Sequence, residues 1–127
     1  MNEFSLKEYQ QFLKLQDEYE AQRTALENKI FPIIKKVWNS ERQPGLRHQG
    51  QLEDKLSLYE ENVVYFHYCC GNTDTDEISI KKLADPKWHE ALELKLQETN
   101  RKLAEYAEKQ RSEELERTEK RLRELKG

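Results

Sequence analysis

The chain has 127 residues, of which 22 are Lys or Arg and 25 are Asp or Glu, for a formal net charge of −3 at pH 7. Charged residues make up 37% of the chain, whereas they make up about 25% of an average globular domain. Hydrophobic residues make up 35%, against about 45–50% in such a domain. These values allow one modest hydrophobic core and argue against a strongly basic nucleic-acid-binding surface.

The N-terminal region predicts an amphipathic helix over residues 5–38. Ser5 and Glu8 have the spacing of a capping box, in which the hydroxyl accepts from the amide three residues further on. Apolar side chains then recur every three or four residues, so they share one face that needs a partner. Pro32 lacks an amide hydrogen and predicts a kink or a break in the turn before it.

A polar loop follows the helix, around the turn signal Pro44-Gly45. It contains Arg42 and Arg47, with His48 beside them. Because loops often carry binding residues and Arg suits anions and protein contacts, these two arginines are candidate partner-binding residues. An alternative function for residues 42–51 is the binding of a small ligand or nucleotide by a homo-oligomer.

The middle third changes from a helical period to alternation and predicts a three-stranded antiparallel meander over residues 52–83. The expected strands and the two turns between them are residues 52–59, 60–62, 63–70, 71–76 and 77–83. In the third strand, Ile78, Ile80 and Leu83 are expected to face the core. An alternative is a helix over residues 51–60, which would leave a two-stranded hairpin.

A long helix is expected from residue 86 onward. Asp85 is a good N-cap, and Pro86 occupies the first turn, where a missing amide hydrogen costs nothing. Apolar side chains as far as Ala107 indicate that the first half packs on the sheet and on the first helix. One α+β domain over residues 1–107 is therefore expected.

Residues 108–127 are expected to form a charged helical extension. Acidic residues precede basic ones by four positions, as in Glu119 and Arg123, and such pairs stabilise an isolated helix. Three interpretations are open: a solvated helix, a helix that binds a partner or a second copy as in a coiled coil, and a disordered tail.

Two groups of residues resemble metal sites. His67, Cys69, Cys70 and His89 include zinc-binding types, but adjacent cysteines diverge and lack the usual Cys-x-x-Cys spacing. Residues 72–83 resemble the start of a calcium loop, but the sixth and twelfth positions hold the wrong residues. We therefore expect no metal and no other cofactor, with both cysteines reduced. The alternative is a metal or redox protein that uses His67, Cys69 and Cys70.

The acidic excess lies in residues 51–85, which contain eight acidic and three basic residues. If the acidic side chains fall in turns, they form one negative end of the sheet that attracts a basic partner. A single-layer sheet also leaves some aromatic side chains exposed for protein contacts. The candidate partner-binding residues of this segment are Glu60, Glu61, Asp74, Asp76, Glu77, Tyr65 and Tyr68.

No known catalytic motif is present in the sequence. It contains no glycine-rich phosphate loop, no Gly-x-Ser-x-Gly motif and no His-Glu-x-x-His motif. We therefore expect a protein that is not an enzyme. No apolar run approaches the roughly 18–20 residues of a membrane span, and the N-terminus lacks the features of a signal peptide, so a cytoplasmic location without membrane contact is expected.

The layout resembles that of a known class of proteins. A capped helix, a meander that contains Asp76-Glu77-Ile78-Ser79-Ile80, a helix start at Asp85-Pro86 and a long charged helix are similar to small accessory proteins of tailed bacteriophages. Several of these are anti-defence proteins such as anti-CRISPRs. The resemblance implies a non-catalytic inhibitor in the host cytoplasm.

Such an inhibitor would occlude a host defence complex, including one that binds nucleic acid, through the acidic sheet surface or the long helix. The expected partner is thus a host protein or protein complex, with no direct contact to nucleic acid. The resemblance implies no site residues beyond those named above.

Overall fold

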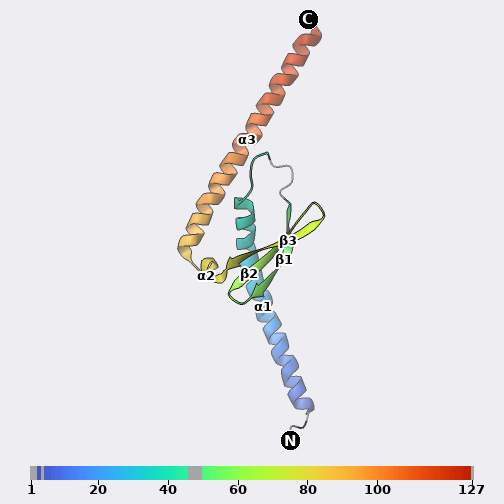
Figure 1. The fold of residues 1–127 in the computed structure, drawn as a ribbon, viewed down its shortest axis with the longest axis vertical. Coiled ribbons are helices and arrows are strands. Elements are labelled where there is room, and N and C mark those ends of the chain that lie inside the picture. The colour runs from blue at the N-terminus through green and yellow to red at the C-terminus, as the bar shows by residue number, and fades with distance from the viewer. Residues whose placement is uncertain (1–2, 4, 46–49, 127) are drawn as a thin grey trace.

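The structure, a computed structural model, describes residues 3, 5–45 and 50–126. It is an α+β fold, as the sequence predicts, with a three-stranded sheet and two long helices (Figure 1). The elements in chain order are α1 (Leu6–Ser40), β1 (Gln51–Tyr59), β2 (Asn62–Cys69), β3 (Asn72–Ser79), α2 (Ile80–Leu83) and α3 (Pro86–Lys126). The N-terminal half of α1 and the C-terminal half of α3 extend away from the sheet in opposite directions (Figure 1).

Helix α1 begins where the capping box predicts and continues through Pro32. The Glu8 amide donates a 3.1 Å hydrogen bond to Ser5 Oγ. Pro32 lies inside the helix and has no amide hydrogen to donate to the Asn28 carbonyl. Both residues are exposed, so water can reach this carbonyl. The helix axis changes direction between the N-terminal half of α1, which is inclined in Figure 1, and the C-terminal half beside the sheet, which is closer to vertical. The break considered from the sequence does not occur.

The sheet has the order β1-β2-β3 with both pairs antiparallel. Residues 51–59 form a strand, so the helical alternative for this segment is wrong. The register pairs Leu58 with Val63 and Ile78 with Val63 across the two ladders. An irregularity between Leu52 and Leu56 inserts extra residues into β1, and such bulges bend a strand.

The third strand begins earlier than predicted. The predicted turn at 71–76 is wrong, because β3 pairs with β2 from Asn72 to Ser79 and only Cys70 and Gly71 lie between these strands. The strand also ends earlier, since Ser79 Oγ accepts from the Lys81 amide at 3.2 Å and caps the short helix α2. Ile78 packs on the core, but Ile80 is exposed.

The core lies between α1 and one face of the sheet. Ile34 of α1 and Val63 of β2 have no exposed surface. The cluster is completed by three buried side chains from β1, β2 and α2, namely Leu56, Tyr65 and Leu83. Partly buried aromatic residues, including Phe31, Trp38 and Trp88, surround this cluster. The core is small, as the low hydrophobic content predicts.

Helix α3 begins after Asp85, whose carboxylate accepts from the Lys87 amide at 3.0 Å. Its first half packs against the C-terminal end of α1, with Leu92 and Thr99 buried. Thr99 Oγ1 donates to the Ser40 carbonyl. Two exposed ion pairs, Lys36–Glu93 and Lys95–Glu41, join the same two helices.

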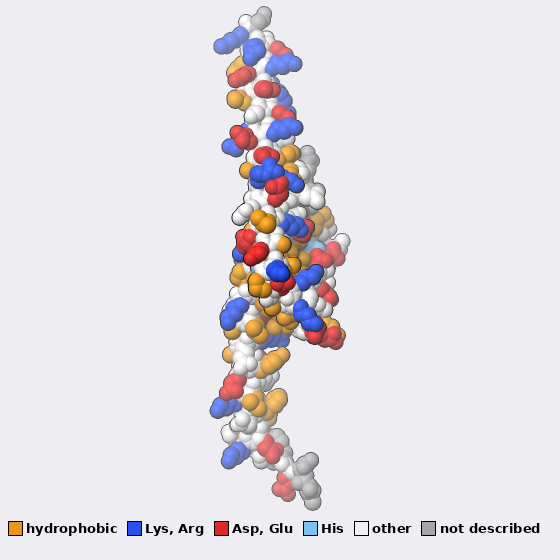
Figure 2. All heavy atoms as spheres, turned by 90° about the vertical axis from the view of Figure 1, so that its left-hand side faces the viewer, with side chains coloured by type: hydrophobic (Ala, Val, Ile, Leu, Met, Phe, Trp, Pro, Cys, Tyr) orange, Lys and Arg blue, Asp and Glu red, His pale blue; other side chains and the backbone are white. Residues whose placement is uncertain are grey.

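The outer half of α3 makes no contact with the described residues of the sheet or of α1 and is exposed (Figure 1). Every residue from Ala104 to Lys126 is exposed, and Figure 2 shows mixed positive and negative side chains along this upper rod. Ion pairs within the helix include Arg101–Glu105 and the predicted Glu119–Arg123 pair at 3.9 Å. Within the described residues, none of the helices combines the length and the hydrophobicity that a membrane span requires.

Candidate functional site

The five acidic residues predicted to form one negative end lie at separate places. Glu60 and Glu61 form the turn between β1 and β2, whereas Asp74, Asp76 and Glu77 lie within β3. The β2–β3 turn consists of Cys70 and Gly71 and holds none of them. The register places Glu77 opposite Val64, near the β1–β2 turn, but Asp74 opposite His67, farther along the sheet. The expectation of one negative end is therefore wrong.

The acidic residues of β3 also divide between the two faces of the sheet, because side chains alternate along a strand. Asp76 Oδ2 lies 2.9 Å from His67 Nε2, on the face toward α1, and Asp74 is the register partner of His67. Glu77 pairs with Val64 and lies on the opposite face.

The two predicted aromatic contact residues have different surroundings. Tyr65 belongs to the core and is only 8% exposed, so its assignment to a partner-binding surface is wrong. Its burial, followed by the nearby charges of Asp76 and Glu41, raises the pKa of the phenol. Tyr68 is 46% exposed on the opposite face of the sheet, where Lys55 Nζ stands 4.7 Å from the centre of the Phe66 ring.

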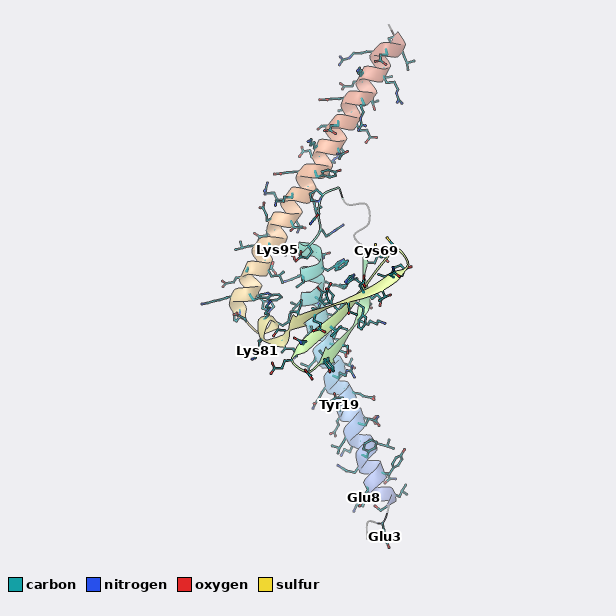
Figure 3. All side chains as sticks on the ribbon, in the orientation of Figure 1. Glu3, Glu8, Tyr19, Cys69, Lys81 and Lys95 are labelled. Carbon is teal, nitrogen blue, oxygen red and sulfur yellow. The ribbon has the colours of Figure 1, made fainter. Side chains whose placement is uncertain are left out.

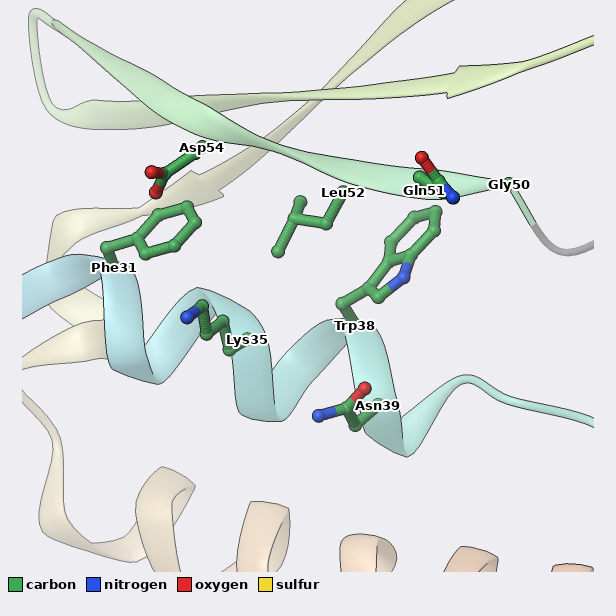
Figure 4. Close-up of a pocket in the computed structure, with 8 residues that line it drawn as sticks. All are labelled: Phe31, Lys35, Trp38, Asn39, Gly50, Gln51, Leu52 and Asp54. Atoms are coloured by element: carbon green, nitrogen blue, oxygen red, sulfur yellow. The ribbon is translucent and has the colours of Figure 1, made fainter.

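The candidate loop is described only in part. Arg42 is exposed after the end of α1, and the predicted Arg47 lies outside the described residues. Near this loop, an open groove of about 520 Å³ separates α1 from the start of β1 (Figure 4). Phe31 and Trp38 form aromatic walls, and Lys35 Nζ lies 5.0 Å from the centre of the Phe31 ring. Such a groove has the size of a small-ligand site.

The candidate metal residues make other contacts. His67 is paired with Asp76, and His89 Nε2 lies 2.6 Å from the Leu83 carbonyl oxygen at the end of α2. In the part of the chain that the structure describes, no three His, Cys, Asp or Glu side chains are grouped in a way that could hold a metal ion. Cys69 and Cys70 do lie together, with their sulfur atoms 3.0 Å apart.

A long exposed apolar surface lies on the N-terminal half of α1. All residues from Ser5 to Leu26 are exposed, and the seven large apolar side chains among them are 39–67% exposed. Figure 2 shows hydrophobic side chains along this lower rod, and Figure 3 labels Tyr19 on it below the sheet. We call this surface the α1 apolar face; it consists of Phe12, Leu15, Tyr19 and Leu26, with Tyr9 stacked against Phe12 at its edge. Leu6 and Leu13 are exposed farther round the helix.

The α1 apolar face was not predicted as a site, although the sequence contains a signal for it. A helix of 35 residues is about 52 Å long, whereas strands of 8 or 9 residues span about 30 Å. A small sheet can therefore cover only about half of this helix. The apolar repeat that packs on the core through Ile34 continues beyond that covered half.

The chain was compared with families, individual proteins and structures. No protein-family model, no curated protein and no solved structure matches it. Any function of this chain is therefore inferred from its own residues.

Proposed function

We propose that this is a non-catalytic protein-binding protein whose contact surface is the α1 apolar face. The observation that carries the proposal is the exposure of four large apolar side chains, Phe12, Leu15, Tyr19 and Leu26, on a single helix face. Contiguous exposed apolar patches are uncommon on monomeric proteins and mark interaction sites. The described part of the chain places no other element over this half of α1 (Figure 1).

The spacing of the exposed side chains supports docking of the helix into a groove. Phe12, Leu15, Tyr19 and Leu26 follow one another at steps of three, four and seven residues, so they lie in one row. Amphipathic helices that bind protein grooves present their anchors in this pattern. Aromatic anchors such as Phe12 and Tyr19 contribute large contact areas.

Charge indicates the chemistry of the partner. Residues 6–27 contain five acidic and three basic side chains. One of the basic residues, Arg23, is already paired with Glu27 at 3.0 Å. The complementary surface is therefore a groove with an apolar floor and a basic rim. Complexes that bind nucleic acids carry such basic surfaces, which supports a host defence complex in the cytoplasm as the partner class.

The test is recovery of a partner from bacterial lysate with three forms of the protein. Leu15→Glu with Tyr19→Glu places two charges on the α1 apolar face. The matched control, Ala21→Glu with Ala25→Glu, places two charges on the opposite side of the same helix. All four positions are exposed, so circular dichroism should show an intact fold in both variants.

Loss of a specific partner by the Leu15/Tyr19 variant, with full recovery by the Ala21/Ala25 variant, is the expected result. The captured protein should bind again when purified, and its surface should carry the basic rim. Equal recovery of the same partner by all three forms would contradict the proposal.

A second candidate is a homo-oligomer that binds a small ligand beside residues 42–51. The groove lined by Phe31 and Trp38 favours the ligand, and the exposed Leu115, Leu122 and Leu125 on α3 favour association. Light scattering on the full chain and on a version ending at Ala107 tests the association. A monomeric mass for both rejects the α3-mediated oligomer, whereas a full-length dimer that the truncation dissociates supports it.

A further inference from the structure

The only two cysteines of the chain lie at the junction of β2 and its turn to β3, Cys69 as the last residue of β2 and Cys70 as the first residue of the turn. Their sulfur atoms are 3.0 Å apart, and both cysteines are free. Figure 3 places Cys69 on the side of the sheet away from α3. The pair is thus close enough for reaction between its own sulfur atoms, at a position remote from the α1–α3 packing.

Reagents in solution can reach this turn. Cys70 is exposed and Cys69 is half-buried. A Cβ atom built on the next residue, Gly71, would have no neighbour within 4 Å. Solvent access is one of the conditions that make a cysteine reactive.

The backbone at Cys70 is unusual for this residue type. Cys70 has φ +58° and Gly71 has φ +88°. Two-residue hairpin turns with positive φ at both positions strongly prefer Asn-Gly or Gly-Gly. A cysteine there costs conformational energy, and the exposed Cys70 side chain gains little from packing. Folding alone therefore does not explain the cysteine, whereas proximity to Cys69 gives it a chemical use.

We propose that Cys69 and Cys70 form a reversible redox site, which a low-molecular-weight disulfide of the glutathione type oxidises to an internal disulfide. One cysteine thiolate attacks a sulfur of the small disulfide, forms a mixed disulfide and releases one thiolate. The second cysteine thiolate then attacks the protein sulfur, and the second small thiolate leaves. Two electrons pass from the protein to the oxidant, and the two protons of the cysteines end on the two released thiols.

The product is a modification that reducing agents readily reverse. Neighbouring Cα atoms are about 3.8 Å apart, less than the roughly 4.4–6.8 Å of ordinary disulfides. The resulting strain makes such a bond easier to reduce than a structural disulfide. This agrees with the expectation from the sequence that adjacent cysteines form no permanent structural bond.

The two cysteines have different roles in the proposed reaction. Cys70 is the more exposed, so it attacks the small disulfide first. The hydrogen bond to Cys70, then partial burial and the charge of Cys70, raise the pKa of the Cys69 thiol. Cys69 therefore remains protonated longer and acts second, as the resolving group.

The experiment treats the reduced full-length chain with oxidised glutathione at neutral pH and follows intact mass and free thiols. We expect the wild type to lose two hydrogens and both free thiols without retaining glutathione, and dithiothreitol to reverse the change. Cys69→Ser should hold one glutathione on Cys70. Cys70→Ser should form its adduct about tenfold more slowly, because the remaining thiol is less accessible.

A local signal checks that the bond forms inside the folded hairpin. Asn72 is the register partner of Cys69, and Gln51 is the partner of Tyr68. Their amide resonances should shift on oxidation, while those of the outer half of α3 stay unchanged. The proposal is overturned if the wild type stays reduced, accumulates stable glutathione adducts, or forms disulfide-linked dimers under conditions in which circular dichroism shows it folded.

Discussion

The hydroxyl of Thr99 in α3 donates a buried 2.8 Å hydrogen bond to the backbone carbonyl of Ser40, at the last residue of α1. The final carbonyls of a helix have no partner within it, so a side chain from 59 residues further along the chain satisfies this one. Ser40 Oγ in turn donates to the Val37 carbonyl at 2.7 Å. This contact connects the two long helices through a buried polar group where the end of α1 meets α3.

Thr99→Val should lower the free energy of unfolding by about 1–3 kcal/mol, because it keeps the shape of the side chain but leaves the buried Ser40 carbonyl unpaired. Urea denaturation followed by circular dichroism measures the change. Thr118→Val is the matched control, since Thr118 Oγ1 bonds an exposed carbonyl of its own helix at 2.9 Å. The control should change stability by less than about 0.5 kcal/mol. Equal losses for both variants would contradict the structural role of Thr99.

Pro32→Ala should stabilise the protein, because it restores a hydrogen bond to the Asn28 carbonyl in the interior of α1. A proline in a helix interior costs about 3 kcal/mol, and part of that cost should be recovered. Thermal unfolding should show a higher midpoint than for the wild type. Lys29→Ala, on the same exposed side of the helix, should change the midpoint little. An unchanged or lower midpoint for Pro32→Ala would show that the helix has adapted to the proline.

Gly50→Ala should destabilise the fold more than Gly71→Ala. Both glycines have positive φ, +85° and +88°, so each alanine carries left-handed strain of about 1 kcal/mol. At Gly50 the added Cβ would also lie 2.8 Å from the Tyr68 carbonyl oxygen, whereas at Gly71 it meets nothing within 4 Å. The difference between the two unfolding free energies, expected to be about 1–3 kcal/mol, measures that clash. Equal values would mean that β1 can move away from β2.

Tyr65 should make stability fall at alkaline pH. Burial, with the charges of Asp76 and Glu41, raises the pKa of the phenol above its ordinary value of 10.0. The folded state therefore holds this proton more tightly than the unfolded chain. The protonated phenol therefore contributes to folding stability below pH 10, and this contribution is lost as the pH rises through the pKa of Tyr65 in the folded state. Tyr65→Phe has no proton to lose there, so its stability should fall less steeply above pH 10. Parallel curves for the two proteins would contradict the effect of burial.

The boundaries that depend on neighbouring residues were predictable. Ser5 with Glu8 and Asp85 with Pro86 mark the two long helix starts, because capping involves only residues within one turn. The β-branched and aromatic run of β2 likewise indicates its own strand.

The errors arose where long-range pairing decides the outcome. The segment 71–76 contains polar turn formers, yet its residues pair with β2 because Gly71 allows a two-residue turn. Tyr65 and Tyr68 are equally aromatic, and only their opposite faces make one a core residue and the other exposed. The acidic residues were treated as members of two neighbouring turns, but the pairing of β3 from Asn72 onward spreads Asp74, Asp76 and Glu77 along a strand and over both faces of the sheet.

The sequence by itself determined the α+β class, the starts of both long helices and the limited size of the core, since caps, periodicity and composition act over a few residues or by total apolar content. The tertiary structure alone decided which surfaces are covered. A sheet shorter than α1 leaves the α1 apolar face exposed, and the β2–β3 register brings Cys69 and Cys70 to an accessible turn. Burial depends on what packs against a residue, and that partner is supplied by a distant part of the chain.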